Sequence, residues 1–279
     1  MERETERGVL ERFRRVLIED GKCGATVEKY MRDAGAFLCF LDGRCVDRGT
    51  VSEYKAFLSE NYEVTSANSM IAAVNAFLKY LGRGDLCTKQ FRVQKKAFCA
   101  ENKELTRAEY YRLISTAGMQ GKVRLGLIIQ TICSSGIRVS ELRSITVEAV
   151  KRGEAEVSLK GKTRCIFIVK ELKKKLLCYA KEQKIESGMI FVTKSGKAVS
   201  RTNIWREMKS LCRDAKVDPQ KVFPHNLRHL FARLFYEMEK DIAKLADILG
   251  HSSINTTRIY IVTTAKEHLK RMEKMRLIL

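Results

Sequence analysis

Apolar residues recur at three- and four-residue spacing along most of this chain, and this helical periodicity constrains its fold more than any other feature. One apolar stripe runs from Val27 to Leu41, a second from Ala67 to Leu81 and a third from Leu227 to Phe235. Only two prolines occur, Pro219 and Pro224, and such scarcity is typical of a mostly helical protein. The sequence therefore predicts a mainly α fold.

One segment carries a β signal instead. The stretches AEVSL (155–159) and TRCIFIV (163–169) have the composition of strands. The three residues between them, Lys160, Gly161 and Lys162, predict a tight turn. The expected fold class is mainly α with a small β-sheet, and the sheet belongs to an α+β domain that follows an N-terminal helical bundle.

Residues 1–84 are expected to form that bundle, with four helices. Thr26 is the expected N-cap of the second helix, because a threonine oxygen can accept the first backbone N–H groups. Gly82 is placed to end the fourth helix, since glycine readily takes the left-handed conformation that follows a helix. A shorter helix is expected before Thr26 and another around Val51–Leu58.

Periodicity fades between residues 85 and 103, and we interpret this basic segment as a linker. A T-x-x-E capping box, formed by Thr106 and Glu109, then starts a second domain at residues 104–279. Residues 266–279 have an apolar stripe between Lys and Arg residues, which predicts a C-terminal tail helix.

The charge of the chain indicates a polyanionic partner. Lys and Arg outnumber Asp and Glu by 53 to 33, for a formal net charge of +20. Double-stranded DNA is the expected partner, although a merely basic soluble protein stays open on charge alone. The candidate DNA-binding residues are Arg83, Lys89, Arg92, Lys95, Lys96 and Lys162.

Metal, cofactor and membrane functions have no support in the sequence. The nine cysteines are scattered, without a C-x-x-C pair or a Cys/His cluster at zinc spacing, so neither metal nor cofactor is expected. The charged N-terminus does not resemble a secretory signal, and the most apolar run, Leu125 to Cys133, is too short to span a bilayer. A cytoplasmic, nucleoid-associated protein is expected.

Two patterns place arginines beside acidic or imidazole groups. In SSGIRVSEL, Arg138 opens a short helix with Glu141 on the same face, which taken alone favours a structural ion pair. In PHNLRHLFARLF, His225 and Arg228 share a face at the start of an apolar helix. His225 and His229 also have the spacing of a zinc helix, but the glutamate of H-E-x-x-H is missing, which argues against a metalloprotease.

A third pattern, LGHSSINTTRIY, places His251 just beyond a helix that Gly250 ends. Tyr260 follows nine residues after His251. By itself, a tyrosine on an apolar stripe is ordinarily a core residue.

Taken together and in order, these patterns resemble the catalytic signature of the tyrosine recombinase (phage integrase) family, especially its Xer-like and integrase members. That signature has an arginine in G-[IL]-R-x-S-E-L, an H-x-x-R pair, a histidine in L-G-H and a tyrosine nine positions later. This chain has GIRVSEL, HNLR, LGH and Tyr260. The family also places a lysine in a β-hairpin, where Lys160 matches best and Lys162 is its rival. The N-terminal bundle resembles the family's core-binding domain only in its helix pattern.

The resemblance implies a site-specific recombinase or integrase that cuts and rejoins DNA through a 3′-phosphotyrosyl intermediate, without metal or ATP. Its two arginines would hold the phosphate, its histidines would donate to the phosphate or exchange a proton with the tyrosine, and its lysine would protonate the departing 5′ oxygen. Glu141 would orient Arg138 or a histidine, or else be a solvated carboxylate. The implied catalytic residues are Arg138, Lys160, His225, Arg228, His251 and the nucleophile Tyr260.

The resemblance further implies a tetramer on two DNA sites, with the tail at residues 266–279 reaching a neighbouring subunit. Accessory DNA-bending proteins are additional candidate partners. Two other functions stay open. A type IB topoisomerase uses similar chemistry to relax DNA, and a non-catalytic DNA-binding regulator could keep the same fold.

Overall fold

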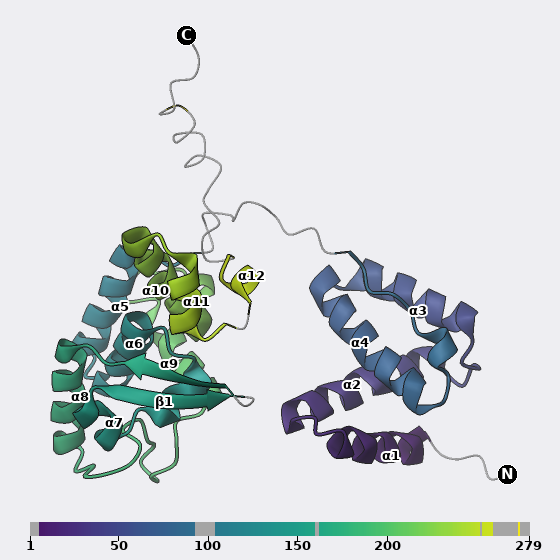
Figure 1. The fold of residues 1–279 in the computed structure, drawn as a ribbon, viewed down its shortest axis with the longest axis horizontal. Coiled ribbons are helices and arrows are strands. Elements are labelled where there is room, and N and C mark those ends of the chain that lie inside the picture. The colour runs from purple at the N-terminus through teal and green to yellow at the C-terminus, as the bar shows by residue number, and fades with distance from the viewer. Residues whose placement is uncertain (1–5, 93–103, 160–161, 252, 259–272, 274–279) are drawn as a thin grey trace. The chain divides into compact units, whose positions relative to one another are not determined.

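The computed structural model describes residues 6–92, 104–159, 162–251, 253–258 and 273 of the 279-residue chain (Figure 1). The chain divides into two compact units, Met1–Lys95 and Lys96–Leu279. Several predicted features lie outside the described residues: Lys95, Lys96, Lys160, Tyr260 and all but Glu273 of the tail at 266–279.

The first unit is a helical bundle, as predicted. Its core consists of aromatic and aliphatic side chains from successive helices, including Phe13, Phe37, Leu58 and Phe77. The second helix packs against both the first and the fourth. The described helices are α1 (Glu6–Glu19), α2 (Gly24–Leu41), α3 (Arg48–Asn61), α4 (Val64–Tyr80) and the 3-10 helix η1 (Gly84–Leu86).

The ends of these helices test two predictions. The prediction that Thr26 caps α2 is wrong, because the helix already begins at Gly24 and Cys23 is its N-cap. Thr26 lies in the first turn, where its backbone N–H donates to the Cys23 carbonyl at 2.8 Å. The helix end at Gly82 is confirmed, since this glycine has φ +72° and follows the last residues of α4.

Residues after η1 are held along α4 by two asparagines. The Asn75 side chain exchanges two hydrogen bonds with the backbone of Thr88, at 2.8 and 3.0 Å. Asn68 does the same with the backbone of Phe91, at 2.9 and 2.7 Å. The basic segment is therefore attached to the first unit up to Phe91.

The apolar helix α6 (Val123–Ser135) lies at the centre of the second unit. It packs against α5 (Arg107–Met119), α8 (Lys170–Glu182), α9 (Arg201–Leu211) and α10 (Pro224–Glu239). The capping box at the start of α5 is confirmed, with Thr106 and Glu109 each accepting from the other's backbone N–H. The described helices are α5 (Arg107–Met119), α6 (Val123–Ser135), η3 (Val139–Ser144), α7 (Val147–Arg152), α8 (Lys170–Glu182), α9 (Arg201–Leu211), η4 (Pro219–Lys221), α10 (Pro224–Glu239), α11 (Ile242–Leu249) and α12 (Ile254–Thr257).

The predicted hairpin is confirmed. Strands β1 (Glu154–Leu159) and β2 (Lys162–Phe167) pair antiparallel, and Leu159 is opposite Lys162. Lys162 is therefore the first residue of β2, so two residues connect the strands and not the predicted three. The fold class, mainly α with a small sheet, is confirmed. Among the helices of the described residues, none has the length and apolar character needed to cross a membrane.

Candidate active site

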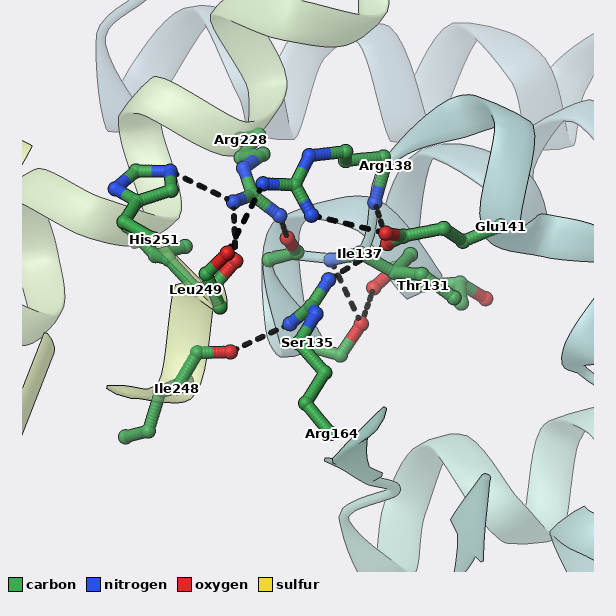
Figure 2. Close-up of polar contacts among 12 residues, drawn as sticks. Thr131, Ser135, Ile137, Arg138, Glu141, Arg164, Arg228, Ile248, Leu249 and His251 are labelled. Atoms are coloured by element: carbon green, nitrogen blue, oxygen red, sulfur yellow. Dashed lines mark hydrogen bonds and ion pairs between the residues drawn. The ribbon is translucent and has the colours of Figure 1, made fainter. Parts of the chain in front are cut away.

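Three helix ends meet at the candidate site in the second unit (Figure 2). Helix α6 ends at Gly136 and α11 ends at Gly250, each with φ +63°, a left-handed conformation that glycine adopts without strain. The first turn of α10 begins with Pro224, whose missing N–H costs nothing at that position. These ends place Arg138, Arg228 and His251 in contact through one polar network.

Arg228 is buried, with 2% of its surface exposed. Its guanidinium donates to the Gly136 carbonyl through Nη1 and to the Leu249 carbonyl through Nη2, the latter at 2.7 Å. Both carbonyls belong to helix C-termini, which carry unsatisfied acceptors and partial negative charge. Arg228 therefore joins the ends of α6 and α11.

Arg138 is more open, and its side chain is 31% exposed. Its Nη1 donates to Glu141 Oε1 at 2.9 Å, its backbone N–H donates to Glu141 Oε2 at 2.9 Å, and its Nη2 lies 3.4 Å from the Gly250 carbonyl oxygen. The predicted Arg138–Glu141 ion pair is confirmed. The alternative of a solvated carboxylate is wrong, because Glu141 is only 4% exposed.

Sequence reasoning missed a third arginine, Arg164 of β2. Its Nη2 donates to Glu141 Oε2 at 2.6 Å and its Nη1 donates to the Ile248 carbonyl at 2.5 Å. Burial by itself would raise the pKa of Glu141, but the Arg138 N–H and the Arg164 and Arg138 charges outweigh burial and lower the pKa. No local signal distinguishes Arg164, since a basic residue in a hairpin strand is ordinary.

His251 follows α11 and contacts two partners. Its Nε2 lies 3.0 Å from Arg228 Nη2, and its Nδ1 lies 2.9 Å from Oγ1 of Thr257, a buried residue that sequence reasoning also missed. Burial, together with the charges of Arg228 and Arg138, lowers the pKa of His251 to about 4. The imidazole is therefore neutral at pH 7.

His225 lies in the first turn of α10, on the exposed side of the site. Its ring meets that of His229 edge-on, with centroids 4.6 Å apart. Partial desolvation and the charges of Arg228 and Arg138 lower the pKa of His225, which places it in the same electrostatic environment.

The predicted DNA-binding residues that can be described lie mostly in the first unit. Lys89, Arg92 and Arg83 are all exposed, and Arg83 also donates to the Val46 carbonyl at 3.0 Å and pairs with Asp85. Lys162 starts β2 in the second unit.

The chemistry of the site suits an anion. The network holds three guanidiniums and one carboxylate: Arg138 and Arg164 pair with Glu141, and Arg228 donates to backbone carbonyls, so the site carries surplus positive charge. Within the described residues, the structure has no group of three or more potential metal ligands.

Comparisons with known proteins identify the family of the chain. The model of the phage integrase family matches residues 103–267, more than half of the chain. The chain is 30% identical to the tyrosine recombinase XerA of Pyrococcus furiosus over 270 residues, covering 94% of this chain and 91% of the relative. It is 28% identical to XerD of Vibrio cholerae over 290 residues, covering 96% and 95%.

Solved structures give the same result for the fold. The crystal structure of XerA recombinase matches with a TM-score of 0.54 and 25% identity, over 99% of this chain and 100% of that chain. A lambda integrase dimer bound to a core site matches with a TM-score of 0.72 over 92% and 95%, and its 17% identity supports the fold alone. The chain belongs to the phage integrase family, as a Xer-like tyrosine recombinase that breaks and rejoins DNA at specific sites.

Proposed function

We propose that Tyr260 attacks a DNA phosphate to form a 3′-phosphotyrosyl intermediate, and that a 5′-hydroxyl then rejoins the strand. One observation carries the proposal: Arg138, Arg228 and His251 come from three distant segments and share one polar network. An anion held there would be next to the segment that leads from His251 to Tyr260.

Arg138 and Arg228 are the proposed phosphate clamp. Attack by an oxygen nucleophile spreads negative charge over the non-bridging oxygens, and a preformed set of donors stabilises that charge without reorganisation. Guanidiniums stay protonated and donate in forked pairs, so they suit a phosphate better than lysines. Arg138 has the exposed surface needed to reach a phosphate.

The histidines and the hairpin lysine are the proposed proton carriers. The lowered pKa values of His225 and His251 favour neutral rings, which can accept the Tyr260 proton. As the bond from tyrosine oxygen to phosphorus forms, the bond to the 5′ oxygen breaks. Lys160, with Lys162 as its rival, donates a proton to that oxygen. The reverse steps rejoin the strand, and the retained bond energy makes ATP and metal unnecessary.

We propose that duplex DNA binds both domains, with residues 1–84 as the core-binding domain and residues 104–279 as the catalytic domain. Lys89 and Arg92 support this, because both are exposed on the segment that Asn68 and Asn75 hold to α4. Solved structures of XerH bound to difH and of the lambda integrase dimer on a core site support DNA as the partner. A tetramer on two sites, coupled by the tail at 266–279, is part of the proposal.

A nicked suicide substrate tests the chemistry, because loss of a short strand traps the covalent protein–DNA adduct. The wild-type chain should form an adduct that survives denaturation. Tyr260→Phe should bind DNA equally well and form none, because only the nucleophilic oxygen is removed. Tyr111→Phe is the matched control at an exposed tyrosine and should behave as wild type.

Failure of the wild-type chain to form an adduct would favour a non-catalytic regulator, and an adduct in Tyr260→Phe would identify another nucleophile. Relaxation of plasmids that lack any specific site would favour a topoisomerase.

A further inference from the structure

Arg164 is buried beside the proposed catalytic residues. It is the third residue of β2, the strand that follows the two-residue connection containing Lys160. Its side chain is 12% exposed, and both terminal nitrogens are committed to protein acceptors. Within the described part of the chain its Nε is buried without a hydrogen-bond partner. A buried donor without an acceptor lowers the stability of the fold. A residue present only to stabilise the fold would avoid this cost.

The two acceptors of Arg164 belong to the segments that carry Arg138 and His251. Glu141 Oε2 accepts hydrogen bonds from Arg164 Nη2 and from the Arg138 backbone N–H. Glu141 Oε1 accepts one from Arg138 Nη1. The Ile248 carbonyl lies in the last turn of α11, three residues before His251. Figure 2 shows the Arg164 guanidinium between these two segments.

Gly250 makes room for Arg164. A Cβ added to Gly250 would overlap Cδ of Arg164 and lie 2.8 Å from its Nε. The glycine in the L-G-H motif therefore has two tasks, since it ends α11 at φ +63° and lets the arginine stem pass against the backbone. This packing fixes β2 against the turn that leads to His251.

Arg164 also sets the charge available to a phosphate. Glu141 is buried and ionised, and with Arg138 as its only cationic partner it would offset that arginine's charge. The second guanidinium at 2.6 Å compensates the carboxylate, so the group of three keeps one net positive charge. Interactions among buried charges are screened weakly, so this difference reaches a phosphate bound at Arg138.

We propose that Arg164 is a positioning residue for DNA cleavage. It compensates the negative charge of Glu141, so that the positive charge of Arg138 remains available to the phosphate. It also fixes β2 to the segments that carry Arg138 and His251. The inference rests on the proposed function, because it assigns Arg138 and His251 to the reacting phosphate. Arg164 would act through Arg138 and His251, because both of its terminal nitrogens donate to protein acceptors.

A double-mutant cycle tests the proposal, with adduct formation on a suicide substrate measured at saturating DNA. Arg164→Met should lower the cleavage rate about 100-fold while the Kd for DNA changes less than about threefold. In a Glu141→Gln background the loss in cleavage rate caused by Arg164→Met should be at least about fivefold smaller, because no buried carboxylate is left uncompensated. Arg164→Lys keeps the positive charge but lacks the forked guanidinium, and it should cleave about tenfold faster than Arg164→Met.

Thermal unfolding accompanies each variant, and rates are compared well below the lowest Tm. If Arg164→Met does not fold, Arg164→Lys replaces it in the cycle, with an expected loss of about tenfold in the presence of Glu141 and a smaller loss in the Glu141→Gln background. Arg213→Met removes an arginine from an exposed site and should cleave like wild type.

Two results would overturn the positioning role: a folded Arg164 variant that cleaves within about threefold of wild type, or an equal rate loss with and without the Glu141→Gln substitution. Wild type and Tyr260→Phe are assayed alongside. Absence of a wild-type adduct would refute the proposed function itself, whereas a normal wild-type adduct with unaffected Arg164 variants refutes only the role of Arg164.

Discussion

Arg228 Nη2 lies 3.0 Å from Nε2 of His251, and this contact defines the protonation of the imidazole. A guanidinium can only donate, so Nε2 accepts and the ring proton resides on Nδ1. Nδ1 then donates to Thr257 Oγ1 at 2.9 Å. His251 is thus oriented from both sides as a neutral ring. A phosphate that draws Arg228 Nη2 away would release Nε2 to accept a proton.

Thr257→Val tests this orientation, because valine keeps the shape of threonine and removes the acceptor of the Nδ1 proton. We expect a loss of about 1–2 kcal/mol in the free energy of unfolding, since a partly buried donor is left without its partner. Cleavage should fall about tenfold as the ring loses its fixed orientation. Thr256→Val, at the exposed neighbouring position, is the control. Equal behaviour of the two variants in urea unfolding and adduct assays would contradict the role of Thr257.

Two partly buried histidines, His229 and His251, predict that acid destabilises the fold. Burial lowers the pKa of His251 and of His229 to about 4, below the value of 6.5 that an exposed histidine has. The unfolded chain therefore binds more protons than the folded chain between these pH values, so stability falls as the pH drops through this window. We expect a loss on the order of 2 kcal/mol between pH 7 and pH 4.5.

Urea unfolding at several pH values measures this loss. His229→Asn should flatten the dependence, because one of the two depressed pKa values is removed. A wild-type free energy of unfolding that stays constant over the window would show that these histidines are not held neutral.

Arg228 and Arg138 should respond differently to lysine. Arg228→Lys loses the fork that joins the Gly136 and Leu249 carbonyls, so we expect about 2–3 kcal/mol less stability as well as at least about 100-fold slower cleavage. Arg138→Lys, at a partly exposed site, should slow cleavage by a similar factor but lower the free energy of unfolding by less than about 1 kcal/mol. Chemical unfolding and adduct kinetics separate the two effects. Normal cleavage by both variants would refute the phosphate clamp.

Gly250→Ala measures the close approach of Arg164. The new methyl would meet the arginine stem at a backbone φ of +63°, so both strain and overlap oppose it. Gly121→Ala is a matched control, because Gly121 has φ +65° and open space where a Cβ would lie. We expect the control to lose about 1 kcal/mol of the free energy of unfolding, and Gly250→Ala to lose at least about 2 kcal/mol more. Equal losses in thermal unfolding would show that Arg164 moves aside freely.

DNA binding should weaken steeply with salt. Release of counterions from five or more phosphates gives a log–log slope steeper than about −4. The double variant Lys89→Gln/Arg92→Gln should make that slope shallower by about 2, because two exposed cations are removed. Fluorescence anisotropy over a range of salt concentrations checks both values. A flat wild-type slope would show that the net charge of +20 does not serve DNA binding.

Much of this fold is encoded locally. The T-x-x-E box at Thr106 starts α5 as predicted, and the strand-like stretches around residues 160–162 form the hairpin, because capping and strand pairing depend on neighbours in the chain. The predicted start of α2 was wrong for a reason that is also local. A helix has no strict need for a side-chain cap, and this one begins at Gly24 before the threonine that could have supplied it.

The sequence by itself determined the family and the residues that match its signature, since the spacing within GIRVSEL, HNLR and LGH is independent of tertiary contacts. Only the tertiary structure decided which groups support them. Arg164 meets Glu141 across 23 residues of chain, and Arg228 meets the Gly136 carbonyl across 92. Such pairs leave no periodic trace in sequence, because a long-range hydrogen bond arises only where folding brings a donor and an acceptor together.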